Sequence, residues 1–247
     1  MTGILYFSST GNSLYIAEQI KKENDGKIIY IPKYTGDASE FDKLIIVCPV
    51  YSFGLPAHVF KLIPRLNFTI PLYLVLNYGG FLGGADYLAY KHCEDCGVNI
   101  KAVYAMQMPE NFTVTFNVPE GYKKKLLEEA PEKAEEIAKL IAENKKNLPK
   151  KKKTFAASYH KNRHNWNKLA KDFSIADSCT KCGRCVRLCP TKNITLENGS
   201  ITFADNCVAC LGCYHRCPEK AVLYKKKPPK KQYINPDIDI EKLGRNQ

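Results

Sequence analysis

The sequence predicts an α/β protein with a doubly wound parallel sheet of five strands, followed by a small α+β domain. Two observations carry this prediction. Short apolar runs alternate with amphipathic helical patterns through residues 1–147. Eight of the eleven cysteines then fall between Cys179 and Cys217, in two sets of identical spacing. A chain of 247 residues has room for one medium domain and one small one.

The five predicted strands are short and nearly continuous in apolar residues, as strands buried on both faces of a parallel sheet should be. They are expected at residues 3–7, 27–31, 43–51, 71–77 and 99–106. Between and after them, apolar residues recur at helical spacing. Helices are expected at residues 12–23, 56–66, 85–96 and 122–147, the last with a kink at Pro131.

The pattern changes after this region. Residues 148–173 are expected to form a basic linker with a short helix near 165–171. Residues 174–224 combine short strands, tight turns and the cysteine sets, with a hairpin around Asn198-Gly199. Residues 225–247 are expected to form an extended tail that packs back on the body. The predicted division is therefore 1–147, 148–173, 174–224 and 225–247.

Composition narrows the class of protein. The N-terminal residues lack the basic and apolar regions of a signal peptide, and the longest apolar stretch contains prolines and charges. The prediction is a cytoplasmic protein without a membrane span. In a reducing compartment, clustered cysteines bind metal or carry out redox chemistry rather than form disulfides. The formal charge of +12 would attract acidic partners.

The cysteine sets each read C-x2-C-x2-C-x3-C-P. The first is Cys179, Cys182, Cys185 and Cys189, and the second is Cys207, Cys210, Cys213 and Cys217, each position 28 residues after its counterpart. Three cysteines two residues apart let a tight loop wrap one corner of a cubane cluster, and the fourth points away. Zinc sites usually use pairs of closely spaced ligands, and a disulfide scaffold requires a secreted chain. The sets therefore predict two [4Fe–4S] clusters.

This stretch resembles the two-cluster bacterial ferredoxin domain over about 50 residues. In that family the fourth cysteine of each set ligates the other cluster. The resemblance implies that cluster one is held by Cys179, Cys182, Cys185 and Cys217. It likewise implies that cluster two is held by Cys207, Cys210, Cys213 and Cys189.

A second motif, "FSSTGNS", lies between the first predicted strand and the first predicted helix. It is rich in hydroxyls and ends at a helix N-terminus, where free amides and the helix dipole favour an anion. It contains no lysine and no G-x-G-x-x-G, which excludes a Walker loop and a Rossmann dinucleotide site. The predicted ligand is a phosphate, held by Ser8, Ser9, Thr10, Gly11, Asn12 and Ser13.

This loop resembles the phosphate loop of the flavodoxin family, which has the form T/S-x-T-G-N-T/S and binds FMN. The resemblance implies a flavodoxin-like sheet of order 2-1-3-4-5, with two later loops closing around the flavin ring. The candidate residues after the third strand are Pro49, Val50, Tyr51, Ser52, Phe53 and Gly54. Those after the fourth strand are Asn77, Tyr78, Gly79, Gly80, Phe81 and Gly83. The alternative is that these aromatics belong to the core and the glycines only form turns.

The combination resembles the flavodoxin–ferredoxin fusion proteins called ferrodoxins, and "CPVYSFGLP" and "MPENF" match their layout. The resemblance implies one FMN and two [4Fe–4S] clusters in one chain. The predicted function is electron transfer that couples two-electron FMN chemistry to one-electron transfer. The expected partners are soluble redox donors and acceptors, acidic ones among them.

Two other functions fit some of the features. The chain could be an FMN-dependent reductase of a small substrate, fed by its own clusters. It could also be a nucleic-acid-binding redox sensor, with Tyr159 and Trp166 stacking on bases among the lysines of the linker. Of these, nucleic-acid binding is not expected, and a solvated linker or a docking site for an acidic partner explains the lysines better.

Three further residue groups carry weaker signals. Cys93 and Cys96 have the spacing of a redox pair, but the acids between them disfavour a thiolate. Cys48 is expected to be a buried small hydrophobic residue. His215, inside the second cysteine set, is expected at the surface rather than as a group that tunes a cluster.

Overall fold

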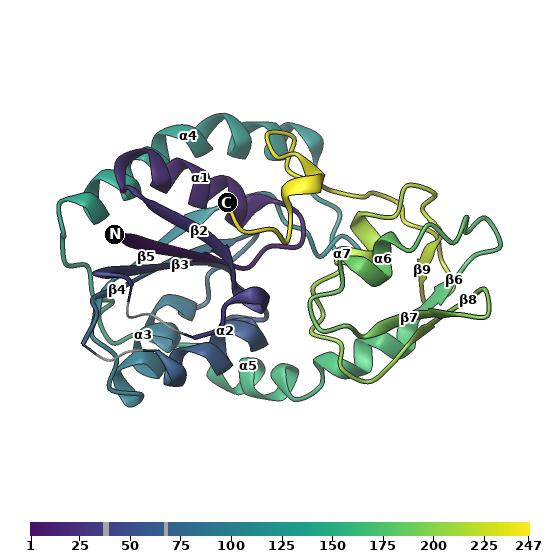
Figure 1. The fold of residues 1–247 in the computed structure, drawn as a ribbon, viewed down its shortest axis with the longest axis horizontal. Coiled ribbons are helices and arrows are strands. Elements are labelled where there is room, and N and C mark those ends of the chain that lie inside the picture. The colour runs from purple at the N-terminus through teal and green to yellow at the C-terminus, as the bar shows by residue number, and fades with distance from the viewer. Residues whose placement is uncertain (37–39, 67–68) are drawn as a thin grey trace.

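The protein was analysed as a computed structural model, which describes residues 1–36, 40–66 and 69–247. Its N-terminal part is a five-stranded parallel sheet of order β2-β1-β3-β4-β5 (Figure 1). Two small antiparallel sheets, β6-β9 and β7-β8, follow at the right of Figure 1. The predicted flavodoxin-like strand order and the small α+β part that follows it are both confirmed.

All five predicted strands are present, each with ends within two residues of those expected. They are β1 (Thr2–Tyr6), β2 (Gly26–Tyr30), β3 (Lys43–Pro49), β4 (Leu72–Tyr78) and β5 (Ile100–Gln107). The three inner strands, β1, β3 and β4, are almost entirely buried, which accounts for their largely apolar sequence. In Figure 1 the strands run side by side, so their carboxyl ends meet at one edge of the sheet.

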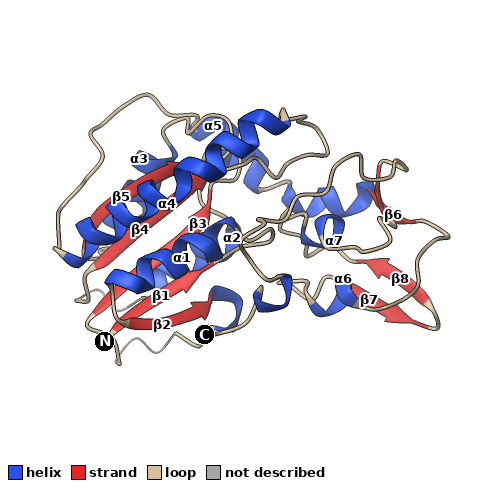
Figure 2. Cartoon of the chain, turned by 90° about the horizontal axis from the view of Figure 1, so that it is seen from above, coloured by secondary structure: helices blue, strands red, loops and turns tan. Residues whose placement is uncertain are grey.

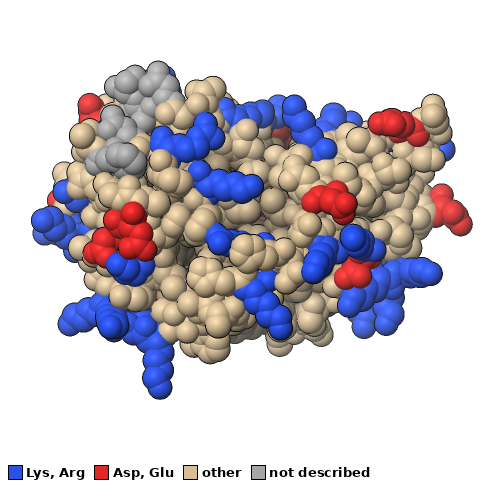
Figure 3. Space-filling view, turned by 90° about the horizontal axis from the view of Figure 1, so that it is seen from below, with Lys and Arg blue, Asp and Glu red and all other residues tan. Residues whose placement is uncertain are grey.

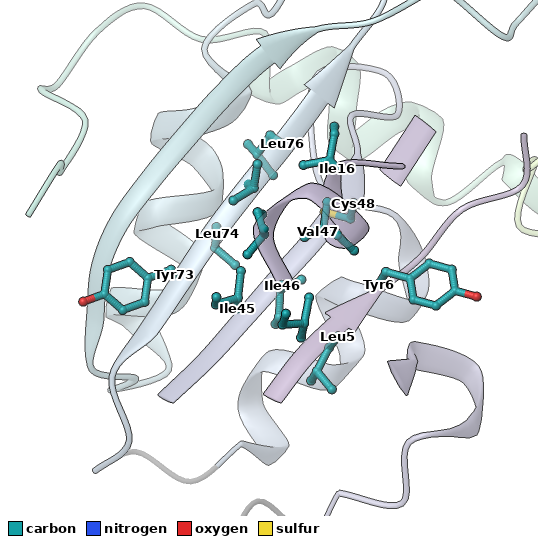
Figure 4. Close-up of a cluster of buried hydrophobic side chains, with 14 of the residues drawn as sticks. Leu5, Tyr6, Ile16, Ile45, Ile46, Val47, Cys48, Tyr73, Leu74 and Leu76 are labelled. Carbon is teal, nitrogen blue, oxygen red and sulfur yellow. The ribbon is translucent and has the colours of Figure 1, made fainter. Parts of the chain in front are cut away.

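Helices cover both faces of the sheet. In Figure 1, α1 (Asn12–Glu23) and α4 (Glu120–Ala142) lie above it, and α2 (Ala57–Leu62) and α3 (Ala85–Asp95) lie below it. Figure 2 gives the same arrangement from above. A short 3₁₀ helix (Ile63–Arg65) continues α2 to the end of the predicted segment. The core between these layers is made of aliphatic side chains such as Ile16, Ile45 and Leu74 (Figure 4).

The last helix of this part differs from the prediction. α4 begins at Glu120, two residues before the predicted start, and continues through Pro131 as one helix. It ends at Ala142 rather than at residue 147, and Asn144 just beyond it has the left-handed backbone that terminates helices, with φ of 55°. Asn147 lies instead against β5, where its carbonyl accepts from the Val103 amide at 2.8 Å.

The lysine-rich segment contains more structure than the sequence indicates. α5 (Ala156–Arg163) and a 3₁₀ helix (Trp166–Asp172) occupy it. The 3₁₀ helix corresponds to the expected short helix, whereas α5 is an addition. Because lysines dominate this segment, its sequence gives little sign of the few side chains that pack against the rest of the protein. Tyr159 is buried, and its hydroxyl donates to the Leu55 carbonyl at 2.9 Å.

The C-terminal part is built from two similar halves. It contains β6 (Phe173–Ile175), α6 (Arg184–Arg187), β7 (Ile194–Glu197), β8 (Ser200–Phe203), α7 (Gly212–His215) and β9 (Val222–Tyr224). The predicted hairpin is β7-β8, and both Asn198 and Gly199 have the positive φ of a two-residue turn. α7 begins 28 residues after α6, the same interval as between the cysteine sets.

The tail packs back on the sheet, as expected. In Figure 1 it runs from the C-terminal part to the label C, beside β2. Gln247 and Ile28 exchange two backbone hydrogen bonds, at 2.7 and 2.9 Å. The buried Tyr6 hydroxyl donates to the Arg245 carbonyl and accepts from the Gly244 amide, both at 3.0 Å. Both outer strands of the sheet therefore have chain lying against them. Within the described ranges, none of the helices has the length and apolar character needed to cross a membrane.

Candidate functional site

The hydroxyl-rich loop lies at the carboxyl end of β1 and leads into α1. Its polar side chains are buried, between 1% and 5% exposed. Gly11, within the loop, has a positive φ of 103°. This backbone conformation suits glycine, and it lets the Gly11 amide donate to the Ser8 hydroxyl at 3.0 Å. The loop therefore turns tightly and brings the first amides of α1 to the edge of the sheet.

Several hydrogen-bonding groups of this loop have no protein partner. Among the described residues, no acceptor is bonded to the amides of Ser9, Thr10, Asn12 and Ser13. The other hydroxyls of the loop are paired, but Ser9 Oγ is buried without a partner. A buried polar group without a partner is costly. Free amides at a helix start together with an orphaned hydroxyl fit the oxygens of a phosphate group.

The loop after β3 contains an unusual turn. Tyr51 and Gly54 exchange backbone hydrogen bonds at 2.9 and 3.1 Å, which leaves Ser52 and Phe53 as the two turn residues. Both have positive φ, 47° and 71°, although neither is glycine. Non-glycine residues in this region are strained, and such strain often lies at ligand sites. Just before the turn, Pro49 ends β3 and the Val50 amide donates to the Asn77 carbonyl at 2.8 Å.

The loop after β4 lies against both other loops. The Asn77 side chain donates to Ser13 Oγ at 2.8 Å, a buried contact with the phosphate loop. A Cβ on Gly83 would lie 2.3 Å from the Phe53 ring, and one on Gly79 would lie 2.3 Å from a Glu110 oxygen. Tyr78 and Gly80 are at the open side of the loop, where a Cβ on Gly80 would meet nothing within 4 Å.

Three phenylalanines gather between these loops. Phe53 stacks on Phe155 with ring centroids 4.7 Å apart, and Phe81 meets both rings edge-on, at 6.3 and 5.7 Å. Phe81 is 66% exposed and Phe155 is 48% exposed. Phe155 comes from the lysine-rich segment, and its amide donates to the Gly83 carbonyl at 3.1 Å. Apart from being aromatic, Phe155 carries no sequence signal that marks it as part of this site.

Tyr51 lies apart from these rings. It meets Phe7 and Trp166 edge-on, at centroid distances of 6.3 and 6.0 Å. Burial raises the pKa of its phenol well above the ordinary value, and the nearby Ser9 hydroxyl opposes this effect. Its hydroxyl lies near the Ser9 hydroxyl, and neither of these two buried groups makes a hydrogen bond of normal geometry. Trp166 and Tyr159 are themselves buried, 8% and 4% exposed, so neither ring can stack on a nucleic-acid base.

The cysteines predicted for cluster one lie together. Cys179, Cys182, Cys185 and Cys217 all line one small cavity beneath Ile175 and Val222. Burial raises the pKa of the Cys185 thiol, and the other three sulfurs raise it further. Cys182 is exposed, so this site reaches the surface. Among the described residues no three side chains converge as closely as a single metal ion requires.

The cysteines predicted for cluster two also lie together, but deeper. Burial raises the pKa of the Cys210 thiol to about 12, with Cys207 and Cys189 adding to the shift. It raises that of Cys213 well above its ordinary value, next to the same sulfurs. Thiols in such surroundings become thiolates only when a cation offsets the charge. Both sets therefore have the donor chemistry that an iron–sulfur cluster needs.

The backbone repeats itself around the two sites. Lys181 and Ala209 have positive φ, as do Gly183 and Leu211 and also Lys192 and Lys220, each pair 28 residues apart. Equivalent amides, those of Asn193 and Ala221, donate to Cys189 and Cys217 at 3.2 and 3.3 Å. In the second half Leu211 adopts the left-handed conformation that Gly183 adopts in the first. The next residue, Gly212, is therefore not needed for the backbone freedom of glycine.

Gly212 marks the contact between the two parts of the chain. The position of a Cβ on Gly212 lies 3.6 Å from Cys210 Sγ, 3.6 Å from Ser9 Cβ and 3.7 Å from Arg216 Cζ. Arg216 is 4% exposed, and it donates from Nε to the Ser9 carbonyl at 2.6 Å and from Nη2 to the Ser8 carbonyl at 3.2 Å. The second cysteine set thus lies directly against the phosphate loop.

His215 is not at the surface, contrary to the prediction. It is 3% exposed, its Nε2 is 2.7 Å from the Asn111 carbonyl, and its Nδ1 accepts from the Tyr233 amide at 3.0 Å. It therefore joins α7 to the loop after β5 and to the tail. The reason is its position in the repeat, next to the contact between the two parts, which sequence alone does not show.

The tail and the loop after β5 enclose the phosphate loop. Asn12 Oδ1 accepts from Tyr233 Oη at 2.6 Å and from Asn235 Nδ2 at 3.1 Å, and Asn12 Nδ2 donates to the Pro109 carbonyl at 3.0 Å. Asn111 donates to Thr10 Oγ1 at 3.1 Å. Asn12, a candidate cofactor ligand, thus uses its side chain to hold the surrounding chain.

The remaining cysteines are set apart from this site. Cys48 is fully buried in β3, as expected. Burial raises the pKa of the Cys93 thiol to about 12, and it also raises that of Cys96. Both shifts disfavour the thiolate form on which cysteine reactivity depends.

Comparisons with known proteins give a match to the cysteine-rich part of the chain. Residues 178–222 match the family model described as a 4Fe-4S dicluster domain. Together with the strand order of the sheet, this defines the chain as a flavodoxin-like fold joined to a 4Fe-4S dicluster domain. No curated protein matches the sequence.

Solved structures similar to the chain include several flavodoxins. The two-electron reduced flavodoxin of Megasphaera elsdenii is 24% identical and matches 56% of this chain and 99% of its own, with a TM-score of 0.41. The Fusobacterium nucleatum flavodoxin bound to flavin mononucleotide is 19% identical, over 59% of this chain and 98% of its own, with a TM-score of 0.42. A flavodoxin from the domain Archaea is 17% identical, over 57% and 99%, with a TM-score of 0.40.

Proposed function

We propose that the protein is an electron-transfer protein that binds one FMN and two [4Fe–4S] clusters. FMN exchanges electrons in pairs or singly and each cluster carries one electron, so together they convert between two-electron and one-electron chemistry. One observation carries the proposal: Cys210 and Ser9 lie against the same point, beside Gly212. The predicted cluster ligand and the predicted phosphate ligand thus belong to one continuous site.

The phosphate loop would hold FMN by the free amides of Ser9, Thr10, Asn12 and Ser13 and by the Ser9 hydroxyl. The loops after β3 and β4 would border the flavin ring, with Phe53 and Phe81 as the aromatic side chains beside it. Phe155 adds a third ring to this border. None of these three aromatic side chains can act as an acid–base catalyst. Their role would be to orient the ring and to limit its contact with water.

Each cysteine set would hold one cluster by the crossed assignment given above. The grouping of Cys217 with the first set and of Cys189 with the second supports it. Amide donors to Cys189 and Cys217 would stabilise the extra negative charge of a reduced cluster. The glycine and left-handed residues let each loop curve closely around its cluster.

The two clusters would have different roles. Cluster two lies against the flavin-side loop through Cys210, whereas cluster one reaches the surface at Cys182. A soluble partner would therefore exchange electrons at cluster one. Lysines and arginines are spread over the face shown in Figure 3, and an acidic partner fits this charge. A cytoplasmic location fits the thiolate ligands.

The test is anaerobic purification followed by analysis of iron, sulfide and flavin, and then a reductive titration that follows flavin and clusters together. About eight iron atoms and one FMN per chain, with fast exchange of electrons between them, is the expected result. Full iron without FMN, even after incubation with excess FMN, would contradict the proposal. The sheet would then be a docking domain for a plain ferredoxin.

The second candidate is an FMN-dependent reductase of a small substrate, fed by the chain's own clusters. An open pocket over the flavin would favour it. The Phe53, Phe81 and Phe155 rings contact one another beside the loops, and rings that cover the flavin would favour the electron carrier instead.

A further inference from the structure

Arg216 is a buried cation without a buried anion beside it. Among the described residues, the arginines that pair with a carboxylate are Arg184 and Arg245, both with Glu241, and Arg216 is not one of them. Its protein partners are the carbonyls of Ser8 and Ser9, which carry only partial charge. Burying an unpaired charge costs several kcal/mol, so a negative group near Arg216 is needed to offset it.

The nearest group that can become negative is the second cysteine set. Arg216 Cζ and Cys210 Sγ lie within 3.7 Å of the same point, the Cβ position of Gly212. A [4Fe–4S]²⁺ cluster with four thiolates carries a net charge of −2 and gains another negative charge on reduction. A fixed cation beside it favours the reduced form more than the oxidised form, and it does so strongly where water is excluded.

The same side chain also determines how the phosphate loop is oriented. In a planar trans peptide the N–H points away from the C=O. Because Arg216 holds the carbonyls of Ser8 and Ser9, the following amides, those of Ser9 and Thr10, point to the opposite side of the loop. These are two of the amides without a protein acceptor. Arg216 thus turns both donors toward the place where a phosphate would lie.

The two halves of the repeat differ at this position. The residue 28 positions before Arg216 is Leu188, which carries no charge. Arg187, the arginine next to it, is exposed and donates to the Cys182 carbonyl at 2.8 Å. Water screens an exposed charge. The buried cation therefore distinguishes the surroundings of the second cysteine set from those of the first.

We propose that Arg216 is a positioning residue that couples cluster two to the phosphate loop. Its charge raises the reduction potential of cluster two above that of cluster one, and its hydrogen bonds orient the amides that receive the FMN phosphate. The two effects share one side chain, so FMN binding and cluster reduction affect each other, and by the same factor in both directions. The inference rests on the proposed function, because it requires both groups to bind.

The test compares R216M, R216K and the control R187M in protein that carries its clusters. R216M removes the charge and both hydrogen bonds at nearly constant length, and R216K keeps the charge. We measure iron content, both cluster potentials by a redox titration followed by electron paramagnetic resonance, and the FMN dissociation constant by flavin fluorescence.

In R216M one cluster step is expected to move to lower potential by at least a tenfold change in its reduction equilibrium, which is 59 mV for one electron. The other step is expected to stay in place, and FMN binding to weaken at least tenfold. R216K is expected to keep the potential within threefold of the wild type while losing FMN affinity, since an ammonium cannot match the guanidinium fork. R187M is expected to change neither.

The proposal fails if R216M leaves both steps unchanged, if both steps move equally, or if R187M has the same effect as R216M. If R216M does not retain iron, R216K and the wild type test the proposal instead. The higher-potential step of the wild type must then move when FMN is added. A wild type that lacks iron or FMN would reject the proposed function itself. If clusters bind and FMN does not, the potential of R216M still tests the role of the charge.

Discussion

Single residues at the contact between the two parts carry several tasks at once. Asn12 fits the phosphate motif, yet its side chain bonds to Tyr233, Asn235 and Pro109 and so holds the tail and the loop after β5 in place. Its backbone amide has no acceptor among the described residues and is therefore available to a ligand. The motif thus identifies the correct residue, but the polar contacts of its side chain depend on chain that lies far away in the sequence, 97 residues at the nearest.

Replacing Asn12 by Leu is expected to lower the free energy of unfolding by about 2 to 4 kcal/mol, because it leaves buried partners of its amide unpaired. Chemical denaturation followed by circular dichroism measures this. Asn99→Ala is the control, since its side-chain hydrogen bond to the Thr69 carbonyl is exposed, and a loss below about 0.5 kcal/mol is expected. Equal losses in the two variants would contradict the role given to Asn12.

The buried His58 side chain is expected to make the free energy of unfolding depend on pH. Its Nε2 is buried without a partner near Phe7, and burial together with Lys61 lowers its pKa from 6.5 to about 4. Between these values the unfolded chain binds a proton that the folded chain does not. Stability is therefore complete above pH 6.5 and falls as the pH drops toward 4.

Between pH 7 and pH 5, His58 is expected to account for a loss of about 2 kcal/mol. His58→Phe removes the titrating group, so its unfolding free energy is expected to fall less over this interval. Denaturation at the two pH values measures the difference. A variant with the same pH dependence as the wild type would show that His58 is protonated in the fold.

At the scale of elements, Tyr159 contacts the loop after β3 and is one of the side chains that dock α5. The Tyr159 ring lies so close to Gly54 that a Cβ there would be 2.4 Å away. The only tryptophan, Trp166, meets both Tyr159 and Tyr51 edge-on. The glycine after the strained turn therefore allows α5 to dock beside the candidate flavin site.

Gly54→Ala is expected to push α5 away and to destabilise the protein by about 1 to 3 kcal/mol. The change in the surroundings of Trp166 makes its fluorescence the direct measurement. Gly80→Ala, at a position where a Cβ meets nothing within 4 Å, is the matched control and is expected to leave the spectrum unchanged. An unaltered spectrum in Gly54→Ala would mean that α5 is not held by this contact.

How far the sequence predicts each element depends on where its stabilising contacts come from. α1 was predicted to the residue, because its apolar face and its preceding loop are local signals. α5 was missed, because its docking depends on one tyrosine and on the space left by a distant glycine. The cysteine sets were predicted residue by residue, whereas Arg216 and His215 were not, because only the docked arrangement buries them.

At the scale of the whole molecule, the C-terminal part has little apolar core. Its separate cluster of buried side chains consists of Phe173, Leu211, Tyr214 and Val222. A core of this size cannot offset the entropy of ordering about 50 residues. Ligation of the clusters would supply the missing free energy, as structural metals do in other small domains.

Removal of iron by a chelator is expected to unfold residues 174–224 while the sheet stays folded. Limited proteolysis with mass spectrometry is the measurement, and cleavage is expected first between the cysteine sets. The iron-loaded protein, treated alike, is the control. Resistance of this segment to proteolysis after complete loss of iron would show that its fold does not depend on the clusters.

The chain that lies against both outer strands of the sheet has a further consequence. A free strand edge exposes unpaired amides and carbonyls and invites another molecule to add a strand, which leads to aggregation. Here Asn147 occupies part of the β5 edge and Gln247 part of the β2 edge. The protein therefore shields its sheet with the segment that follows α4 and with the C-terminal tail. An affinity tag fused directly to Gln247 would disturb that shield, so a tag belongs after a flexible spacer.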